Sequence, residues 1–179
     1  MTIMLHDYRD SVDKIRIETL VAALRSGEFD QTGGYLKSND SYCCLGVACE
    51  IMPGVTWEDT EGVSTKIPVF NGKRDGHHYL PSFAREYYGL PNDDVSPSGG
   101  IGFIDNLHII VDLKDSMAYG FDTPQGYIAT DRITFAANAN DTEGVTFEFI
   151  ADAIERTYLD DEYYRDWLAS YHQNHAPRP

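Results

Sequence analysis

The sequence has few positive charges and no long apolar run. Its 179 residues include 14 lysines and arginines against 29 aspartates and glutamates, giving a net charge of −15. This balance argues against direct nucleic-acid binding, which depends on cations that neutralise phosphates. No apolar run approaches the roughly 18 residues of a membrane span, and the opening MTIMLHDYRD lacks a signal-peptide core. We therefore expect an intracellular protein that binds neither membranes nor nucleic acid directly.

Cysteine is also scarce. The three cysteines, Cys43, Cys44 and Cys49, are an odd number, which argues against a disulfide framework and suits a reducing compartment. Together with His77 and His78 they do not show the paired spacing of zinc ligands. We predict no metal site and no cofactor.

The length and the apolar pattern predict one compact α+β domain over residues 1–172, followed by a disordered tail at 173–179. Helices lie at both ends, and the central segment contains strands. Helical spacing predicts helices at 12–26, 42–51, 81–88, 133–138 and 146–158, and a last one from 160. Strands are expected at 63–70 and 107–111, a hairpin turn at Asn71-Gly72, and a mobile loop at 90–102.

Two groups of segments resemble motifs of a family of small uncharacterised proteins encoded by bacteriophages and prophages. The first group is LRSGEFDQ at 24–31 with YCCLGVAC at 42–49. The second is AND at 139–141, GVTF at 144–147 and IADAIE at 150–155. The resemblance leaves residues 55–130 uncovered. It implies a non-structural phage protein in the cytoplasm of an infected bacterium, where many such proteins bind and disable a host component.

Most motif residues have a simpler, structural interpretation. Gly46 permits close approach of a neighbouring backbone to its helix. Phe147, Ile150 and Ile154 have the spacing of a helix face that packs in a core. We expect most of both motifs to serve folding.

A cysteine hydrolase is the alternative function. Cys43 or Cys44 is expected at a helix N-terminus, where the dipole lowers a thiol pKa. In that hypothesis Cys44 is the nucleophile, His108 the base, and Asp112 or Asp122 orients the histidine. Free cysteines more often pack as small buried hydrophobes, so we expect no catalytic residues.

An acidic stripe is the first candidate partner site. Residues 141–166 carry nine acids against two arginines, a local charge of −7. Glu148, Asp152 and Glu155 follow at i+4 and i+3 on one helix, and such a stripe can dock on a basic protein groove, as a DNA mimic does. The competing interpretation is an ordinary solvated helix face.

Aromatic residues with a few cations form the second candidate site. Lys73, Arg74, Tyr79 and Arg85 are predicted to stack a nucleotide base and hold its phosphate. Equally, tyrosine-rich surfaces form protein interfaces and homo-oligomers.

The predicted function is an accessory protein that sequesters or inhibits a bacterial host factor, such as a component of antiviral defence. Its target is a host protein or a small nucleotide signal. The acidic net charge favours the protein, because an anionic nucleotide approaches against the overall field.

Overall fold

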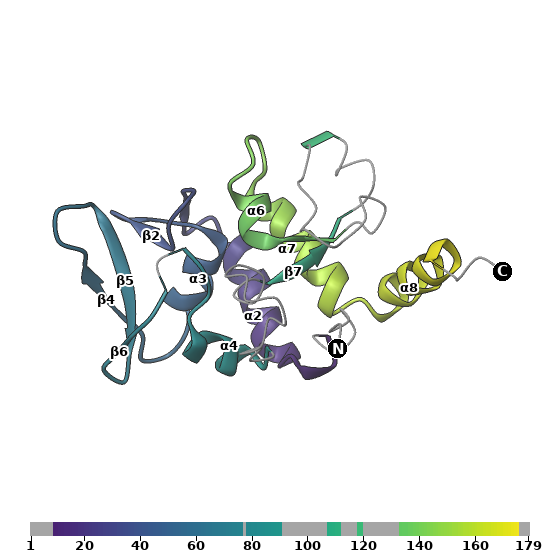
Figure 1. The fold of residues 1–179 in the computed structure, drawn as a ribbon, viewed down its shortest axis with the longest axis horizontal. Coiled ribbons are helices and arrows are strands. Elements are labelled where there is room, and N and C mark those ends of the chain that lie inside the picture. The colour runs from purple at the N-terminus through teal and green to yellow at the C-terminus, as the bar shows by residue number, and fades with distance from the viewer. Residues whose placement is uncertain (1–8, 77, 91–106, 112–117, 120–132, 176–179) are drawn as a thin grey trace.

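The computed structural model describes residues 9–76, 78–90, 107–111, 118–119 and 133–175. Its helices and mixed sheet confirm the α+β prediction. Figure 1 shows the sheet at one end of the molecule, helices α2 and α7 across the centre, and α8 at the other end. Among the helices described, none is both long and apolar enough to cross a lipid bilayer.

The main sheet has the strand order β1-β3-β2-β5-β4, with β6 also paired to β5. Only β1 and β3 run parallel, and the other pairs are antiparallel. The strands are β1 (Asp30–Gln31), β2 (Lys37–Ser38), β3 (Ser41–Tyr42), β4 (Thr56–Asp59), β5 (Thr65–Phe70) and β6 (Lys73–Arg74).

Helices from opposite ends of the chain form the core. α2 (Lys14–Arg25) and α7 (Phe147–Tyr158) pack against each other. Asp13 caps α2 by accepting a hydrogen bond from a backbone amide of its first turn, and Thr146 caps α7 in the same way. The two helices bury apolar stripes at the predicted positions, including Leu20 and Ile154.

The predicted buried helix at 42–51 is α3 (Cys44–Glu50). A Cβ on Gly46 would collide with the backbone carbonyl of Leu36, the residue before β2. The same carbonyl accepts a hydrogen bond from Cys43 N at 3.1 Å. The predicted close backbone approach at Gly46 is therefore confirmed.

The predicted hairpin is also present. Asn71 and Gly72, with φ of 50° and 75°, form the turn between β5 and β6. α4 (Ser82–Tyr88) begins after Pro81 and ends at Gly89, whose φ is 70°. The left-handed conformation at Gly89 stops the helix where the sequence predicts.

The predicted helix at 133–138 is wrong at its start. Residues 133–135 form β8 (Ile133–Phe135), which pairs antiparallel with the predicted strand β7 (His108–Ile110). α6 (Ala136–Asn140) begins only after β8. The β-branched pair Ile133-Thr134 favours a strand once a partner is available, and that partner is remote in sequence. Except for Leu90, the predicted loop at 90–102 lies outside the described residues.

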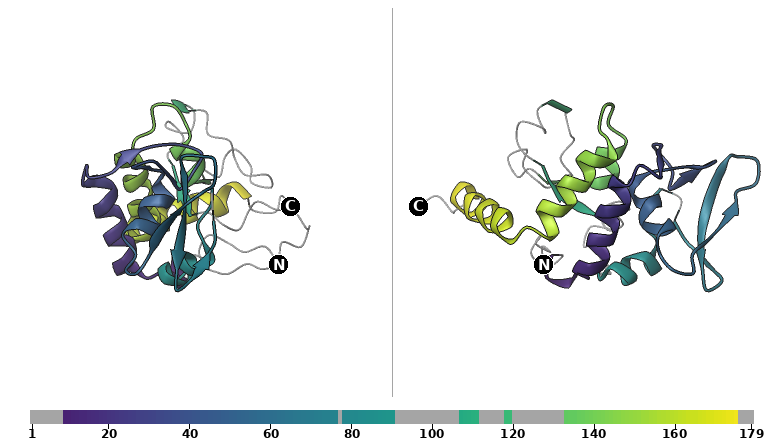
Figure 2. Two further views of the ribbon diagram at one scale, coloured as in Figure 1. Left: turned by 90° about the vertical axis from the view of Figure 1, so that its left-hand side faces the viewer. Right: turned by 180° about the vertical axis from the view of Figure 1, so that it is seen from behind.

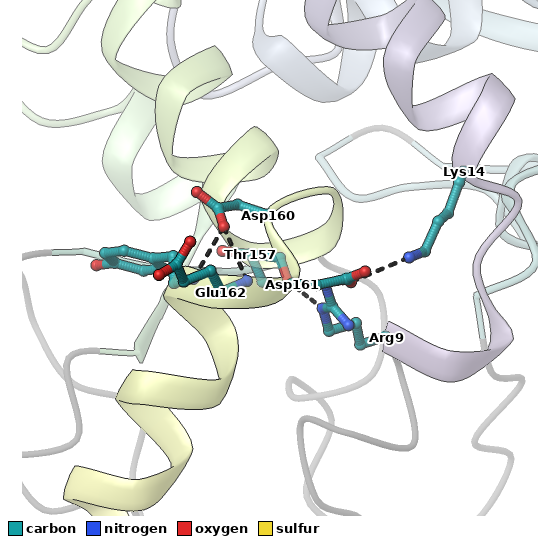
Figure 3. A network of polar contacts seen from close by, with 7 residues as sticks. Arg9, Lys14, Thr157, Asp160, Asp161 and Glu162 are labelled. Atoms are coloured by element: carbon teal, nitrogen blue, oxygen red, sulfur yellow. Dashed lines mark hydrogen bonds and ion pairs between the residues drawn. The ribbon is translucent and has the colours of Figure 1, made fainter.

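The last helix, α8 (Asp161–His175), begins at a polar network (Figure 3). Asp160 Oδ1 accepts from the backbone N of Glu162 at 3.0 Å and of Tyr163 at 2.8 Å. Arg9 bonds to Asp161, which also lies 3.3 Å from Lys14 Nζ. Figure 2 shows from behind that α8 projects away from the sheet.

α8 extends three residues into the segment predicted as a disordered tail. Residues 162–175 contain neither proline nor glycine, so no strong helix breaker lies within this stretch of α8. The rest of the predicted tail, residues 176–179, lies outside the described part of the chain.

Candidate ligand-binding cleft

A cleft of about 480 Å³ lies between the β5–β6 hairpin and α4. This volume is within the range of about 300–1,000 Å³ typical of small-molecule sites. The hairpin, α4, α2 and Met52, which follows α3 (Cys44–Glu50), contribute its lining. The lining residues are Arg16, Met52, Phe70, Asn71, Lys73, Phe83, Glu86 and Tyr87.

Local backbone geometry places the side chains. Phe83, Glu86 and Tyr87 are spaced i, i+3 and i+4 on α4, so they share one helix face. Phe70 and Lys73 are directly paired across the β5–β6 ladder, so their side chains lie on the same face of the hairpin. The cleft therefore forms where one face of a short helix meets one face of a hairpin.

Aromatic contacts form two apolar walls. The rings of Phe70 and Phe83 lie 5.5 Å apart between centroids and are tilted by 33°. The Arg16 guanidinium lies 4.1 Å from the centroid of the Tyr87 ring and donates a hydrogen bond to the Tyr87 carbonyl. Arg16 Nε also lies 3.1 Å from Asp13 Oδ2. Arg16 therefore fixes the Tyr87 wall and is already neutralised.

Lys73 is the cation of this cleft that has no acidic partner among the described residues. In the described part of the chain, every lysine and arginine except Lys73 and Arg165 makes an ion pair or another polar or ring contact. Glu86 likewise makes no ion pair with a described residue. Within the described part of the chain, the cleft thus presents one cation and one carboxylate without ion-pair partners, between aromatic walls.

Of the predicted ligand residues, only Lys73 lines the cleft. Arg74 follows it on β6, so its side chain takes the opposite face, where its Nε lies 3.0 Å from Glu58 Oε2. Arg85 is two residues after Phe83 on α4, which turns it by about 200° around the helix axis. It is therefore not among the lining residues. Tyr79 is exposed but is not among the lining residues. The four residues therefore do not all line this cleft, and their joint role in ligand binding stays a prediction.

Sequence analysis missed most of the lining. Phe83, Glu86 and Tyr87 carry the i, i+3, i+4 signal within the predicted helix at 81–88. The Asn71-Gly72 turn sets Phe70 opposite Lys73, because a two-residue loop pairs the residues that flank it. No local sequence pattern indicates that Arg16 lines this cleft, because only the tertiary packing of α2 brings it there.

The acidic stripe is engaged within the molecule. Arg25, in the last turn of α2, has its Nη2 2.5 Å from Asp152 Oδ1 and 2.6 Å from Glu155 Oε2. Its Nε lies 3.5 Å from Glu148 Oε1. Hydrogen bonds to Glu155 and Asp152 raise the pKa of Arg25. These carboxylates join α7 to α2. The sequence predicts instead that they are available to dock on a partner.

The geometry does not favour the hydrolase alternative. Cys43 and Cys44 lie at the start of α3, as predicted, but Cys44 is only 2% exposed. Burial raises the pKa of Cys44 well above its usual value and lowers that of His108 to about 4. Both shifts oppose an activated thiolate and its base. Asp112 and Asp122 lie outside the described residues.

The cavity beside Cys44 does not admit a substrate. Its volume is about 10 Å³. That is room for about one water molecule. Among the described residues, no group of three or more His, Cys, Asp or Glu side chains is arranged to hold a metal ion.

Asn140 joins the two groups of motifs. Its Oδ1 accepts hydrogen bonds from Cys44 N at 3.1 Å and from Gln31 Nε2 at 3.3 Å. Its Nδ2 donates to the Thr32 carbonyl at 2.8 Å. Gln31 Nε2 also donates to the Val145 carbonyl at 3.0 Å. These motif residues form a polar network that supports the fold.

Residues 13–158 match the profile of the family described as Domain of unknown function (DUF8296). The chain belongs to this family. No curated protein and no solved structure matches the chain. The DUF8296 match runs from the cap of α2 to the end of α7, so it contains the cleft and the Arg25 cluster, whereas α8 lies beyond it.

Proposed function

We propose that this protein is a phage-encoded accessory protein that binds a small nucleotide signal of its bacterial host in the cleft. By sequestering that signal it inhibits the host system that depends on it, such as antiviral defence. The motif resemblance supports the phage setting and the host cytoplasm. The observation that supports the ligand assignment is Lys73, which has no ion-pair partner among the described residues and lies beside two aromatic walls.

The chemistry of the cleft suits a nucleotide. A flat base stacks on aromatic rings, and each such contact is worth about 1–3 kcal/mol in single-stranded nucleic-acid complexes. Lys73 offers three donors and a positive charge to a phosphate oxygen. Phe70 and Tyr87 supply ring surface within the same cleft.

The Arg25 cluster favours this ligand over a protein partner. Three carboxylates of the acidic stripe already bind Arg25, so a basic partner would have to compete with an existing ion-pair network. The net charge of −15 slows the approach of an anion. It does not remove the local attraction of an unpaired lysine, which acts at short range.

Titration calorimetry with mononucleotides tests the proposal. Wild-type protein is expected to bind, and Lys73→Ala to bind about tenfold more weakly, as expected for one lost charge-assisted contact. Lys66→Ala is the matched control, because Lys66 lies on β5 outside the cleft lining, with its Nζ 3.3 Å from Asp59. No binding of any nucleotide, or equal weakening by both substitutions, would overturn the proposal.

A further inference from the structure

We propose that the cleft selects guanine nucleotides and that Glu86 is the residue that determines this specificity. The inference rests on the proposed nucleotide-binding function and concerns the same cleft. It starts from two lining residues of opposite charge, Lys73 and Glu86, neither of which makes an ion pair with a residue that the structure describes.

The two charges come from different elements of the cleft lining. Lys73 is on β6 and Glu86 is on α4. A phosphate is repelled by the carboxylate and attracted by the ammonium, so it binds at the Lys73 wall. The base is left to extend along the aromatic rings toward Glu86.

An ionised carboxylate selects the base edge that it can pair with. Its two oxygens only accept hydrogen bonds. Guanine presents two adjacent donors on one edge, the ring N1–H and the 2-amino group, which match the two oxygens. Adenine and cytosine place a ring acceptor beside the amino group, and uracil flanks its N–H with two carbonyls. Guanine is therefore the common base with two neighbouring donors for Glu86.

Glu86 is free to act in this way. It lies on the exposed side of α4 and makes no ion pair with a described residue. Its neighbour Tyr87 is held by Arg16, so the stacking surface beside the carboxylate is fixed before the ligand arrives. A fixed surface reduces the entropy lost on binding.

The experiment measures dissociation constants of GMP, IMP and AMP for the wild type and for Glu86→Gln. IMP keeps the N1–H of guanine but lacks the 2-amino group. Its dissociation constant is therefore expected to lie between those of GMP and AMP. In the wild type we expect GMP to bind about tenfold more tightly than AMP, the lower range of discrimination by a bidentate contact. Glu86→Gln places an amide donor against a base donor, and the GMP/AMP ratio is expected to fall to about 1.

Glu18→Gln is the control. Glu18 is an exposed residue of α2 outside the cleft lining, and its substitution makes the same change of charge. Because the readout is a ratio, general effects of charge on phosphate affinity cancel. Equal affinity for GMP and AMP, or a preference that survives Glu86→Gln, overturns this inference and leaves the proposed function standing. If none of the three nucleotides binds the wild type, the proposed function fails and the inference fails with it.

Discussion

Asn140 Oδ1 lies 3.1 Å from the backbone nitrogen of Cys44, although the two residues are 96 positions apart in the chain. The contact satisfies an amide in the first turn of α3 that has no partner within its own helix. It also explains why the sequence pairs an Asn-Asp segment with a Cys-Cys segment. Both belong to one buried polar network.

Replacing Asn140 by alanine is expected to lower the free energy of unfolding by about 2–4 kcal/mol. The substitution leaves Cys44 N and the Thr32 carbonyl without their partner, and each unsatisfied buried group costs about 1–3 kcal/mol. Asn138→Ala, an exposed position on the same helix, is the control and is expected to change stability by less than about 0.5 kcal/mol. Urea unfolding measures both. Equal stability of the two variants would contradict the structural role of Asn140.

Gly46→Ala is expected to destabilise the protein by about 3 kcal/mol or more. The added methyl group meets the Leu36 carbonyl, which is backbone and cannot rotate away. Ala22→Gly, on the exposed face of α2, calibrates the ordinary effect of glycine in a helix, a loss of about 1 kcal/mol. Thermal unfolding followed by circular dichroism compares the two. A stabilising effect of Gly46→Ala would show that the backbones do not approach so closely.

Reversing two charges of the acidic stripe is expected to weaken the fold. Lysines in place of Asp152 and Glu155 bring two cations to Arg25 and remove its nearest partners. Because these side chains are 39% and 46% exposed, solvent screening limits the expected loss to about 1–2 kcal/mol. Urea unfolding of the double variant gives the value.

The control for this reversal makes the same charge change on α8. Glu162 and Asp166 are exposed there and form no ion pair with a described residue. Their double replacement by lysine is expected to be better tolerated than the reversal on α7. If both double variants lose the same stability, the Arg25 cluster contributes nothing specific.

His108 is expected to make stability depend on pH. Burial lowers the pKa of His108 from 6.5 to about 4. Between these two pH values the side chain is mostly protonated in the unfolded state and mostly neutral in the folded state. This contribution to stability is complete above pH 6.5 and is lost as the pH falls toward 4. From pH 7.5 to pH 5 the loss is about 2 kcal/mol.

The comparison of wild type with His108→Gln isolates this contribution, because the carboxylates titrate equally in both proteins. The difference in unfolding free energy between the two proteins, followed from pH 7.5 to pH 5, should shrink by the predicted amount. A difference that stays constant over this range would show that His108 does not titrate abnormally.

Local patterns predicted the local structure well. The stripes of α2 and α7, the Asn71-Gly72 turn and the glycine at the end of α4 each depend on neighbours a few positions away. β8 was not predicted, because its strand conformation depends on pairing with β7, which lies more than 20 positions earlier. Tertiary pairing decided the conformation of that segment.

The sites were harder to predict for the same reason. The sequence singled out Lys73, which lines the cleft, but other lining residues come from α2 and α4, and only the folded chain brings them to Lys73. The acidic stripe was recognised as a pattern, but its partner Arg25 lies on another helix, 127 positions from Asp152. A helical spacing shows which residues share a face and cannot show what covers that face.

The most direct test of nucleotide binding in the cleft is an NMR titration. Two-dimensional ¹⁵N–¹H spectra of the labelled protein, recorded as GMP is added, report the environment of each backbone amide. The account predicts that shift changes concentrate at residues 70–73 and 83–87, where the hairpin and α4 line the cleft. Changes centred on residues 148–155, or no change at saturating GMP, would contradict it.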